Sequence, residues 1–243
     1  MASNQYDSIA NELARSVFKE IKDMVLNQES DYFDVILNYI KNGVKLTKIR
    51  FVIQEIQGKK VTFINRDYSV GGGFKWFEEN PSEAFIIVVI NINEDRKKPI
   101  SELDLSGLYS EISASIRHEF EHFRQYHLQE LDRDNHSGLT TLDTPEKARK
   151  YFFNKDEINA HLKEALYMMR KNKGTTLIDN FMNMLDMQFA HQKREKGAQI
   201  TDEGREWIQL YQDIQTEYFA AAAKLFPFLS PEKLGNTTIR QLL

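Results

Sequence analysis

The sequence predicts an α+β protein in which a small sheet follows short N-terminal helices and precedes a long helical region. Three observations lead to this prediction. Apolar residues recur at helical spacing near the start of the chain, strand-forming residues gather between residues 47 and 92, and helical spacing returns from residue 101 onward. Because the strands and most of the helices occupy separate stretches, the chain fits an α+β arrangement.

The N-terminal part of the chain favours two helices. Apolar residues repeat at helical spacing through residues 6–26, which predicts an amphipathic helix there. Residues 31–41 are expected to form a second, shorter helix, because Asn42-Gly43 follows them as a helix stop signal. The composition then shifts toward Ile, Val and Phe, so we expect the sheet to begin near residue 47.

The middle of the chain predicts the strands. Residues 47–56 are rich in Ile, Val and Phe and, with residues 60–65, indicate a β-hairpin. Gly71-Gly72-Gly73 predicts a flexible loop before a short edge strand over residues 74–77. Residues 84–92 are apolar on both faces for most of their length, which is typical of a strand buried in the centre of a sheet.

The remainder of the chain predicts helices, with one long polar connection over residues 129–143. The expected helices cover residues 103–128, 145–153, 155–171, 177–196 and 202–225, and a short final helix follows Ser230-Pro231. Thr144-Pro145 and Ser230-Pro231 place proline at the first helical position. Gly174 and Gly197 are expected to end helices.

Composition and charge exclude several classes of protein. The 243 residues are 41% hydrophobic and 28% charged, which is ordinary for a soluble globular protein. The net charge of −4 argues against general nucleic-acid binding. The chain has no cysteine, so disulfides, cysteine zinc sites and thiol nucleophiles are excluded. Its start lacks the pattern of a signal peptide, and its longest apolar run is too short to span a membrane. We therefore expect a cytoplasmic or otherwise intracellular protein.

One short motif carries chemistry: His118-Glu119-Phe120-Glu121-His122. Residues four apart on a helix lie about 40° apart around its axis, so His118 and His122 can offer two imidazole nitrogens to one tetrahedral Zn²⁺. Glu119 lies beside them, where its carboxylate can accept a proton from a water on the metal and return it to the leaving amine. A chance match to this motif is expected only about 0.01 times in such a chain.

A strand followed by a helix with this motif, and then by helices with an acidic residue, resembles the zincin metallopeptidases. The resemblance covers roughly residues 47–171 and is closest to the gluzincin type, whose third ligand is a glutamate on a later helix. The metzincin type is excluded because Gln125 and Leu128 occupy its glycine and histidine positions. The resemblance implies a small mixed sheet packed on the motif helix within a core of residues 1–173. Residues 174–243 are then a helical extension packed on that core.

The gluzincin resemblance implies Glu157 as the third zinc ligand and places His161 in the site. His161 stands where many relatives have an aspartate that hydrogen-bonds to a ligand histidine. Its role stays open between a partner of a ligand, a catalytic donor to the transition state, and the ligand itself. Asn154 and Glu157 also fit a helix-capping pair, which is the alternative for Glu157. Other candidates are expected on solvated faces or too far along their helix: Glu121, His127, His136, Glu164 and His191.

Further features of the chain would serve a peptidase. Candidates to donate a hydrogen bond to the substrate carbonyl are His161, Tyr151 and Tyr167. An extended peptide could pair with residues 74–77 or 84–92, and the triglycine could act as a flap or be a plain loop. Aromatic residues such as Tyr218 are expected to lie in the core between the C-terminal helices.

Two functions from different classes fit these features. The first is a zinc metalloendopeptidase that acts on proteins or peptides, with neither nucleic acid nor membrane as partner. The second is a non-catalytic structural or assembly protein that keeps a zincin fold and a zinc site, and the chain does resemble small zincin-like proteins of tailed phages in general character. The intact Glu119 favours the enzyme, because a structural zinc site needs no base. The sequence gives no oligomeric state.

Overall fold

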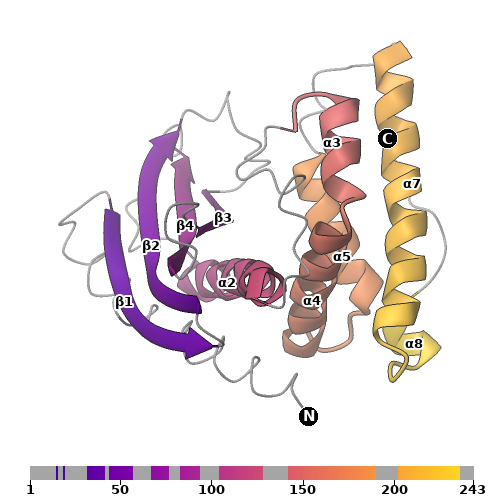
Figure 1. Ribbon diagram of the computed structural model, residues 1–243. Coiled ribbons are helices and arrows are strands. Elements are labelled where there is room, and N and C mark those ends of the chain that lie inside the picture. Colours follow the sequence, from indigo (N-terminus) through magenta and orange to yellow (C-terminus); the bar gives the residue numbers. More distant parts are fainter. Residues whose placement is uncertain are drawn as a thin grey trace. The chain divides into compact units, whose positions relative to one another are not determined.

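The computed structural model describes residues 15, 19, 32–41, 44–56, 67–76, 83–93, 104–127, 142–189 and 202–235. The chain divides into two compact units, Met1–Leu131 and Asp132–Leu243, and each is described by itself. The first unit contains a sheet and a long helix, and the second contains helices (Figure 1). This confirms the mixed α+β class, while the zincin-like arrangement stays a prediction.

The first unit is built on a mixed four-stranded sheet with the order β1-β2-β4-β3. Its strands are β1 (Tyr32–Lys41), β2 (Val44–Ile56), β3 (Tyr68–Trp76) and β4 (Glu83–Asn93). The two central strands, β2 and β4, run parallel, whereas β1 and β3 pair antiparallel with their neighbours. The expected strand over residues 84–92 is confirmed as β4, and β3 is one edge of this sheet.

Helix α2 (Leu105–His127) packs on one face of the sheet. Alternate residues of β4 are buried, and Ile86 and Val88 pack in the same core as Ile112 and Ile116 of α2. Apolar residues two positions apart in a strand lie on one face, as do apolar residues four positions apart in a helix. Each element therefore presents one apolar surface to the other. The helix expected over residues 103–128 is therefore confirmed, and the sheet holds it by apolar contact.

The helix expected over residues 31–41 is wrong, because this segment forms strand β1. Phe33 and Val35 are buried, whereas Tyr32 before them and Ile36 after them are exposed, as expected for a strand with one covered face. Phe33 also stacks on Phe51 of β2, with ring centroids 4.7 Å apart. Non-local pairing with β2 therefore decides the conformation of this segment.

The triglycine segment was expected to be a flexible loop, and this expectation is also wrong. Gly71, Gly72 and Gly73 lie inside β3 and pair with residues 87–89 of β4. They are followed in the same strand by Phe74 and Trp76, so the expected short edge strand begins earlier than predicted. The arm of the expected hairpin at residues 60–65 lies outside the described residues, as does most of the expected N-terminal helix at residues 6–26.

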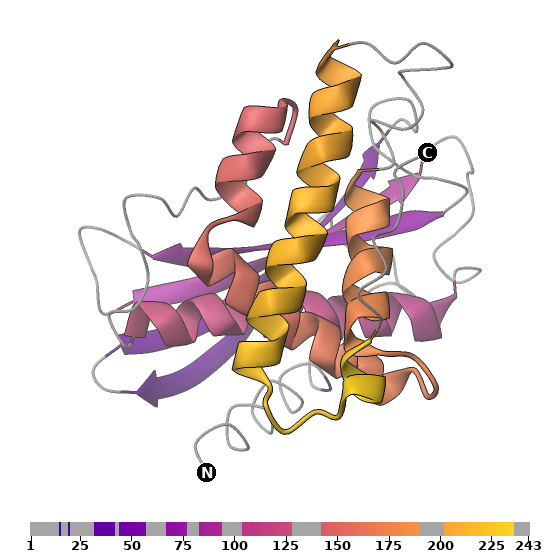
Figure 2. The same ribbon diagram turned by 90° about the vertical axis from the view of Figure 1, so that its right-hand side faces the viewer.

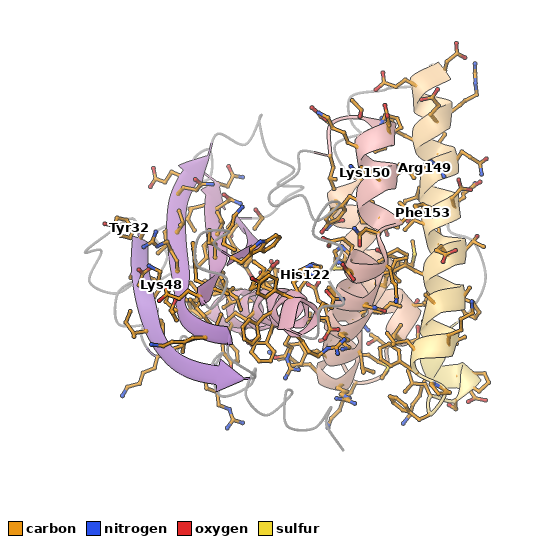
Figure 3. All side chains as sticks on the ribbon, viewed as in Figure 1. Tyr32, Lys48, His122, Arg149, Lys150 and Phe153 are labelled. Atoms are coloured by element: carbon orange, nitrogen blue, oxygen red, sulfur yellow. The ribbon has the colours of Figure 1, made fainter. Side chains whose placement is uncertain are left out.

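The face of the sheet away from α2 carries a charged cluster on β1 and β2. Asp34 accepts two hydrogen bonds from Arg50, at 2.7 and 2.8 Å, and Lys48 lies 3.1 Å from the same carboxylate. Figure 3 labels Tyr32 and Lys48 on these strands. The hydrogen bond from Arg50 and the charges of Arg50 and Lys48 lower the pKa of Asp34 to about 2, although burial opposes the shift.

The second unit consists of helices packed on one another. They are α3 (Pro145–Phe152), α4 (Lys155–Lys171), α5 (Leu177–Gln188), α7 (Asp202–Leu225) and α8 (Pro231–Leu234). Figure 2 shows α7 as the longest helix of this unit. The expected start at Thr144-Pro145 is confirmed, because the Thr144 hydroxyl accepts a hydrogen bond from the Lys147 amide. Helix α4 ends at Lys171 with Asn172 as its C-cap, and Gly174 follows in the next turn with a φ of 88°.

The core of the second unit contains several aromatic rings among its aliphatic side chains. Phe152, Phe181, Tyr211 and Tyr218 are fully buried, and the rings of Phe181 and Tyr218 stack with centroids 4.1 Å apart. The expected helix at residues 177–196 is confirmed up to Gln188, and Gly197 lies outside the described residues. Within the described ranges, no helix has the length and apolar character needed to cross a membrane.

Candidate metal centre

Helix α2 carries the His-Glu-x-x-His motif in the middle of an unbroken helix. The apolar residues on either side of the motif, such as Ile116 and Phe123, are fully buried in the core of the first unit. His118, Glu119 and His122 therefore share one backbone that the sheet holds in place. All three side chains are buried. Burying polar groups is costly unless they have partners or bind a ligand.

The two motif histidines converge on one point. Their Nε2 atoms lie 3.2 Å apart, and their rings are inclined by 73°. Two nitrogen ligands at about 2.0–2.1 Å from a tetrahedral zinc are separated by about 3.3 Å. The positions of His118 and His122 therefore fit two ligands of one zinc ion. The His118–His122 pair expected from the four-residue spacing is thus brought together by α2.

Gln125 orients one of these histidines. Its side-chain oxygen lies 3.0 Å from Nδ1 of His122, and it is almost fully buried. When Nδ1–H donates to this oxygen, the lone pair of the His122 ring is on Nε2, the atom that faces His118. A partner of this kind on the second ring nitrogen is usual for a metal-binding histidine. This role of Gln125 was not predicted from the sequence, although Gln125 follows His122 at the three-residue spacing of one helix face.

Glu119 lies directly beneath the backbone of strand β3. A Cβ atom placed on Gly72 would lie 2.7 Å from Oε1 and 2.8 Å from Cγ of Glu119. The same Cβ atom would lie 2.5 Å from the hydroxyl oxygen of Ser115, which is one turn earlier on α2. The candidate base therefore occupies space that a side chain on β3 would otherwise fill.

Glu121 was expected to be solvated, and this expectation is wrong. Its side chain is only 4% exposed and accepts hydrogen bonds from the guanidinium of Arg124 at 2.6 and 2.9 Å. A two-pronged contact with arginine satisfies both carboxylate oxygens, which lets this charge lie in a buried position. Glu121 therefore has a structural partner on α2 itself.

In the second unit, the start of α4 separates the two interpretations of Glu157. Asn154 is the N-cap, as expected, and its side chain accepts a hydrogen bond from the Asp156 amide at 2.7 Å. In a capping box, the Glu157 carboxylate would accept from the Asn154 amide. That amide instead donates to the carbonyl of Tyr151 at 3.1 Å. Glu157 is buried, and this arrangement favours a role other than capping.

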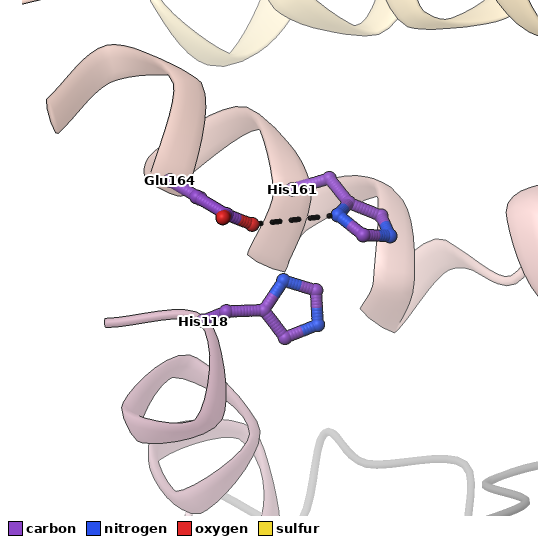
Figure 4. Close-up of side chains that lie close together, drawn as sticks. All are labelled: His118, His161 and Glu164. Atoms are coloured by element: carbon purple, nitrogen blue, oxygen red, sulfur yellow. Dashed lines mark ion pairs between the residues drawn. The ribbon is translucent and has the colours of Figure 1, made fainter. Parts of the chain in front are cut away.

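His161 lies one turn after Glu157 on α4 and is only 2% exposed. Its ring is surrounded by aromatic rings whose centroids lie 5.7–6.5 Å away: Tyr151, Phe152, Phe181 and Tyr218. Nδ1 of His161 faces Oε2 of Glu164 at 3.6 Å (Figure 4). Glu164 was expected on a solvated face, but it is mostly buried and has this partner. At this distance the two groups form an ion pair when the ring is protonated, but not a hydrogen bond.

Tyr218 of α7 brings a hydroxyl group to the same part of the second unit. Its oxygen is buried and has no hydrogen-bond partner among the described residues. Burial and the nearby charge of Glu157 raise the pKa of Tyr218 well above its ordinary value, so the phenol stays protonated. Tyr218 is a core residue, as expected from the sequence, and no local pattern distinguishes such a tyrosine from one that only packs.

The remaining candidates are placed as follows. Tyr151 contacts the ring of His161, and Tyr167 is partly buried on α4. His127 is the last residue of α2, and nothing is described of its side chain. His136 and His191 lie outside the described residues. The structure thus gives two groups of expected site residues: His118, Glu119 and His122 on α2, and Glu157 and His161 on α4.

Comparisons of the chain with protein-family models, with curated proteins and with solved structures give no match. The inference of function therefore depends on the geometry within each unit and on the chemistry of the motif.

Proposed function

We propose that the protein is a zinc-dependent metallopeptidase in which His118, His122 and Glu157 bind the metal and Glu119 is the general base. The observation that carries the proposal is the 3.2 Å separation of the two histidine Nε2 atoms. It matches the spacing of two zinc ligands, and the carboxylate of Glu119 is buried on the same turn of the helix. A site that served structure alone would need no base at this position.

Zinc, when bound, supplies the positive charge that lowers the pKa of a water and polarises the substrate carbonyl. With zinc held there, the carboxylate of Glu119 would accept a proton from the water that attacks the carbonyl carbon. Glu119 then gives the proton to the nitrogen of the leaving peptide. Gln125 keeps Nε2 of His122 as the lone-pair atom throughout, because its oxygen accepts from Nδ1–H.

Glu157 is the third ligand in this proposal, because the gluzincin resemblance gives this place to a glutamate and the side chain is buried. The Asn154 amide, which a capping box would direct to Glu157, donates to the carbonyl of Tyr151 instead. His161 has two chemical options. A charged ring beside Glu164 would present Nε2–H as a donor to the substrate carbonyl oxygen, whereas a neutral ring with Nδ1–H toward Glu164 would present a lone pair. We assign the donor role to His161, because this role leaves Glu157 as the third zinc ligand.

The substrate class is proposed to be an extended peptide. Of the two strands considered for backbone pairing, β4 lies in the centre of the sheet and has both edges occupied. Strand β3 is at the edge of the described sheet and packs against α2. Residues 74–76 of β3 are therefore the better candidate to align a peptide by main-chain hydrogen bonds.

The test is metal analysis of the purified full chain, followed by proteome-wide profiling of cleavage products. We expect about one zinc per chain, loss of zinc in His118→Ala and in His122→Ala, and peptide cleavage by the wild type. Glu119→Gln is the matched control, because it keeps the shape and the metal but cannot accept the proton. Zinc binding without any cleavage would favour the non-catalytic zincin-fold protein, and absence of zinc after zinc-replete expression would reject both.

A further inference from the structure

Gly72 makes an unusually close approach to the candidate base. A Cβ atom at this position would lie 2.7 Å from Oε1 and 2.8 Å from Cγ of Glu119, distances that real side chains do not show. The neighbouring Gly71 is different, because a Cβ atom there would meet nothing within 4 Å. Successive residues of a strand point to opposite faces, so Gly72 faces α2 and Gly71 faces away from it.

The backbone at these two positions accepts an L-residue. Within the described ranges, only Gly174 and Gly235 have positive φ values, so neither Gly71 nor Gly72 needs glycine for its dihedral angles. Both also pair regularly with β4, opposite Val89 and Val88. Alanine at position 72 therefore differs from alanine at position 71 only in what its methyl group would meet.

We infer that Gly72 is a positioning residue for Glu119, because the missing side chain provides the space in which the general base lies. This inference rests on the proposed function for its catalytic part. Ser115 can relieve its own contact by turning its hydroxyl to another staggered position. Glu119 cannot, because its Cγ moves only when χ1 changes, and such a change displaces the whole carboxylate. A methyl group at position 72 thus moves the atoms that take the proton.

The contact can be tested without any assay of activity. We compare melting midpoints of the full chain with chelator present for four proteins: the wild type, Gly72→Ala, Glu119→Ala and the double variant. Gly72→Ala is expected to lower the midpoint in the wild type and to lower it much less when Glu119 is already alanine. If Gly72→Ala alone does not fold, recovery of folded double variant supports the inference. An equal shift in both backgrounds, or a double variant that also fails to fold, overturns it.

The catalytic consequence is measured on the zinc-loaded chain. Gly72→Ala is expected to keep its zinc and its KM but to lose about 100-fold in kcat, the scale of a displacement of about 1 Å at a reacting group. Gly71→Ala is the matched control and is expected to keep the wild-type kcat. Equal kcat values for the two variants would overturn the positioning role. A wild type without cleavage would instead remove the proposed function and leave the melting experiment to decide the contact.

Discussion

The side-chain oxygen of Gln125 lies 3.0 Å from Nδ1 of His122. The other ring nitrogen of His122, Nε2, faces His118. Gln125 and His122 are three positions apart on α2, so this contact is a property of one rigid helix. When Nδ1–H donates to this oxygen, the contact orients the imidazole and leaves the lone pair on Nε2. The metal affinity of His122 is therefore expected to depend on a residue that does not touch the metal.

Gln125→Ala is expected to weaken zinc binding about 10–100-fold, because the ring of His122 loses the acceptor that orients it. Zinc titration against a competing chelator measures this change. Gln125→Glu keeps an oxygen acceptor of the same length and is the control that should retain zinc. Wild-type affinity in Gln125→Ala would show that the sheet and helix alone hold the ring.

The third ligand is decided by two single variants on α4. Glu157→Ala is expected to reduce zinc binding severely, whereas His161→Ala should leave most of the metal in place and lower kcat. Asn154→Ala is the control for capping, and it should cost about 1 kcal/mol of stability without loss of zinc. Zinc titrations and denaturant unfolding separate these effects. Full zinc affinity in Glu157→Ala would contradict the gluzincin assignment and make His161 the leading ligand.

Tyr218→Phe is expected to raise the free energy of unfolding by about 1 kcal/mol, because it removes a buried hydroxyl that has no hydrogen-bond partner among the described residues. The ring itself is retained, so its stacking on Phe181 is unchanged. Urea unfolding of the full chain with chelator present gives the measurement. A loss of stability in Tyr218→Phe would reveal that the Tyr218 hydroxyl has a partner. Tyr211→Phe is the control: it removes a hydroxyl that donates to Asp186, so it should lower the stability.

Asp34 links the stability of the first unit to pH. Its pKa in the folded chain is lowered from 3.8 to about 2, chiefly by the hydrogen bond from Arg50. A lowered pKa means that the stabilisation is fully present above the unfolded value and is lost as pH falls toward 2. Asp34→Asn should therefore cost about 1 kcal/mol at pH 7, after allowance for solvent screening. Urea unfolding should show that most of this cost is lost at a pH of about 2, where Asp34 is about half protonated in the folded chain, and an unchanged cost there would contradict the assignment.

The helices were the part of the fold that local patterns could predict. The bounds expected for residues 155–171 and 202–225 match α4 and α7, because long apolar stripes and clear end signals determine such helices. The histidine pair was also predictable, since one helix fixes its spacing. Sequence alone places Glu157 and His161 on one helix but does not give their partners, which come from residues distant in the chain.

The errors lie where pairing between distant strands decides the conformation. Asn42-Gly43 is a helix stop signal in the sequence, but Lys41 of β1 and Val44 of β2 on either side of it pair with each other. The triglycine of β3 lacks side chains that would indicate a strand, and its close approach to Glu119 becomes visible only when β3 is placed on α2.

The parallel pairing of β2 with β4 has a consequence for how the first unit folds. Strands β1 and β2 can form a local hairpin, and so can β3 and β4, because each pair is antiparallel and adjacent in sequence. The two hairpins then meet only along β2 and β4, whose contacts close a longer loop of chain. We expect this union to be the slow step. Until it occurs, α2 has no complete sheet to dock on, so we expect the side chains of His118 and His122 to become buried late in folding.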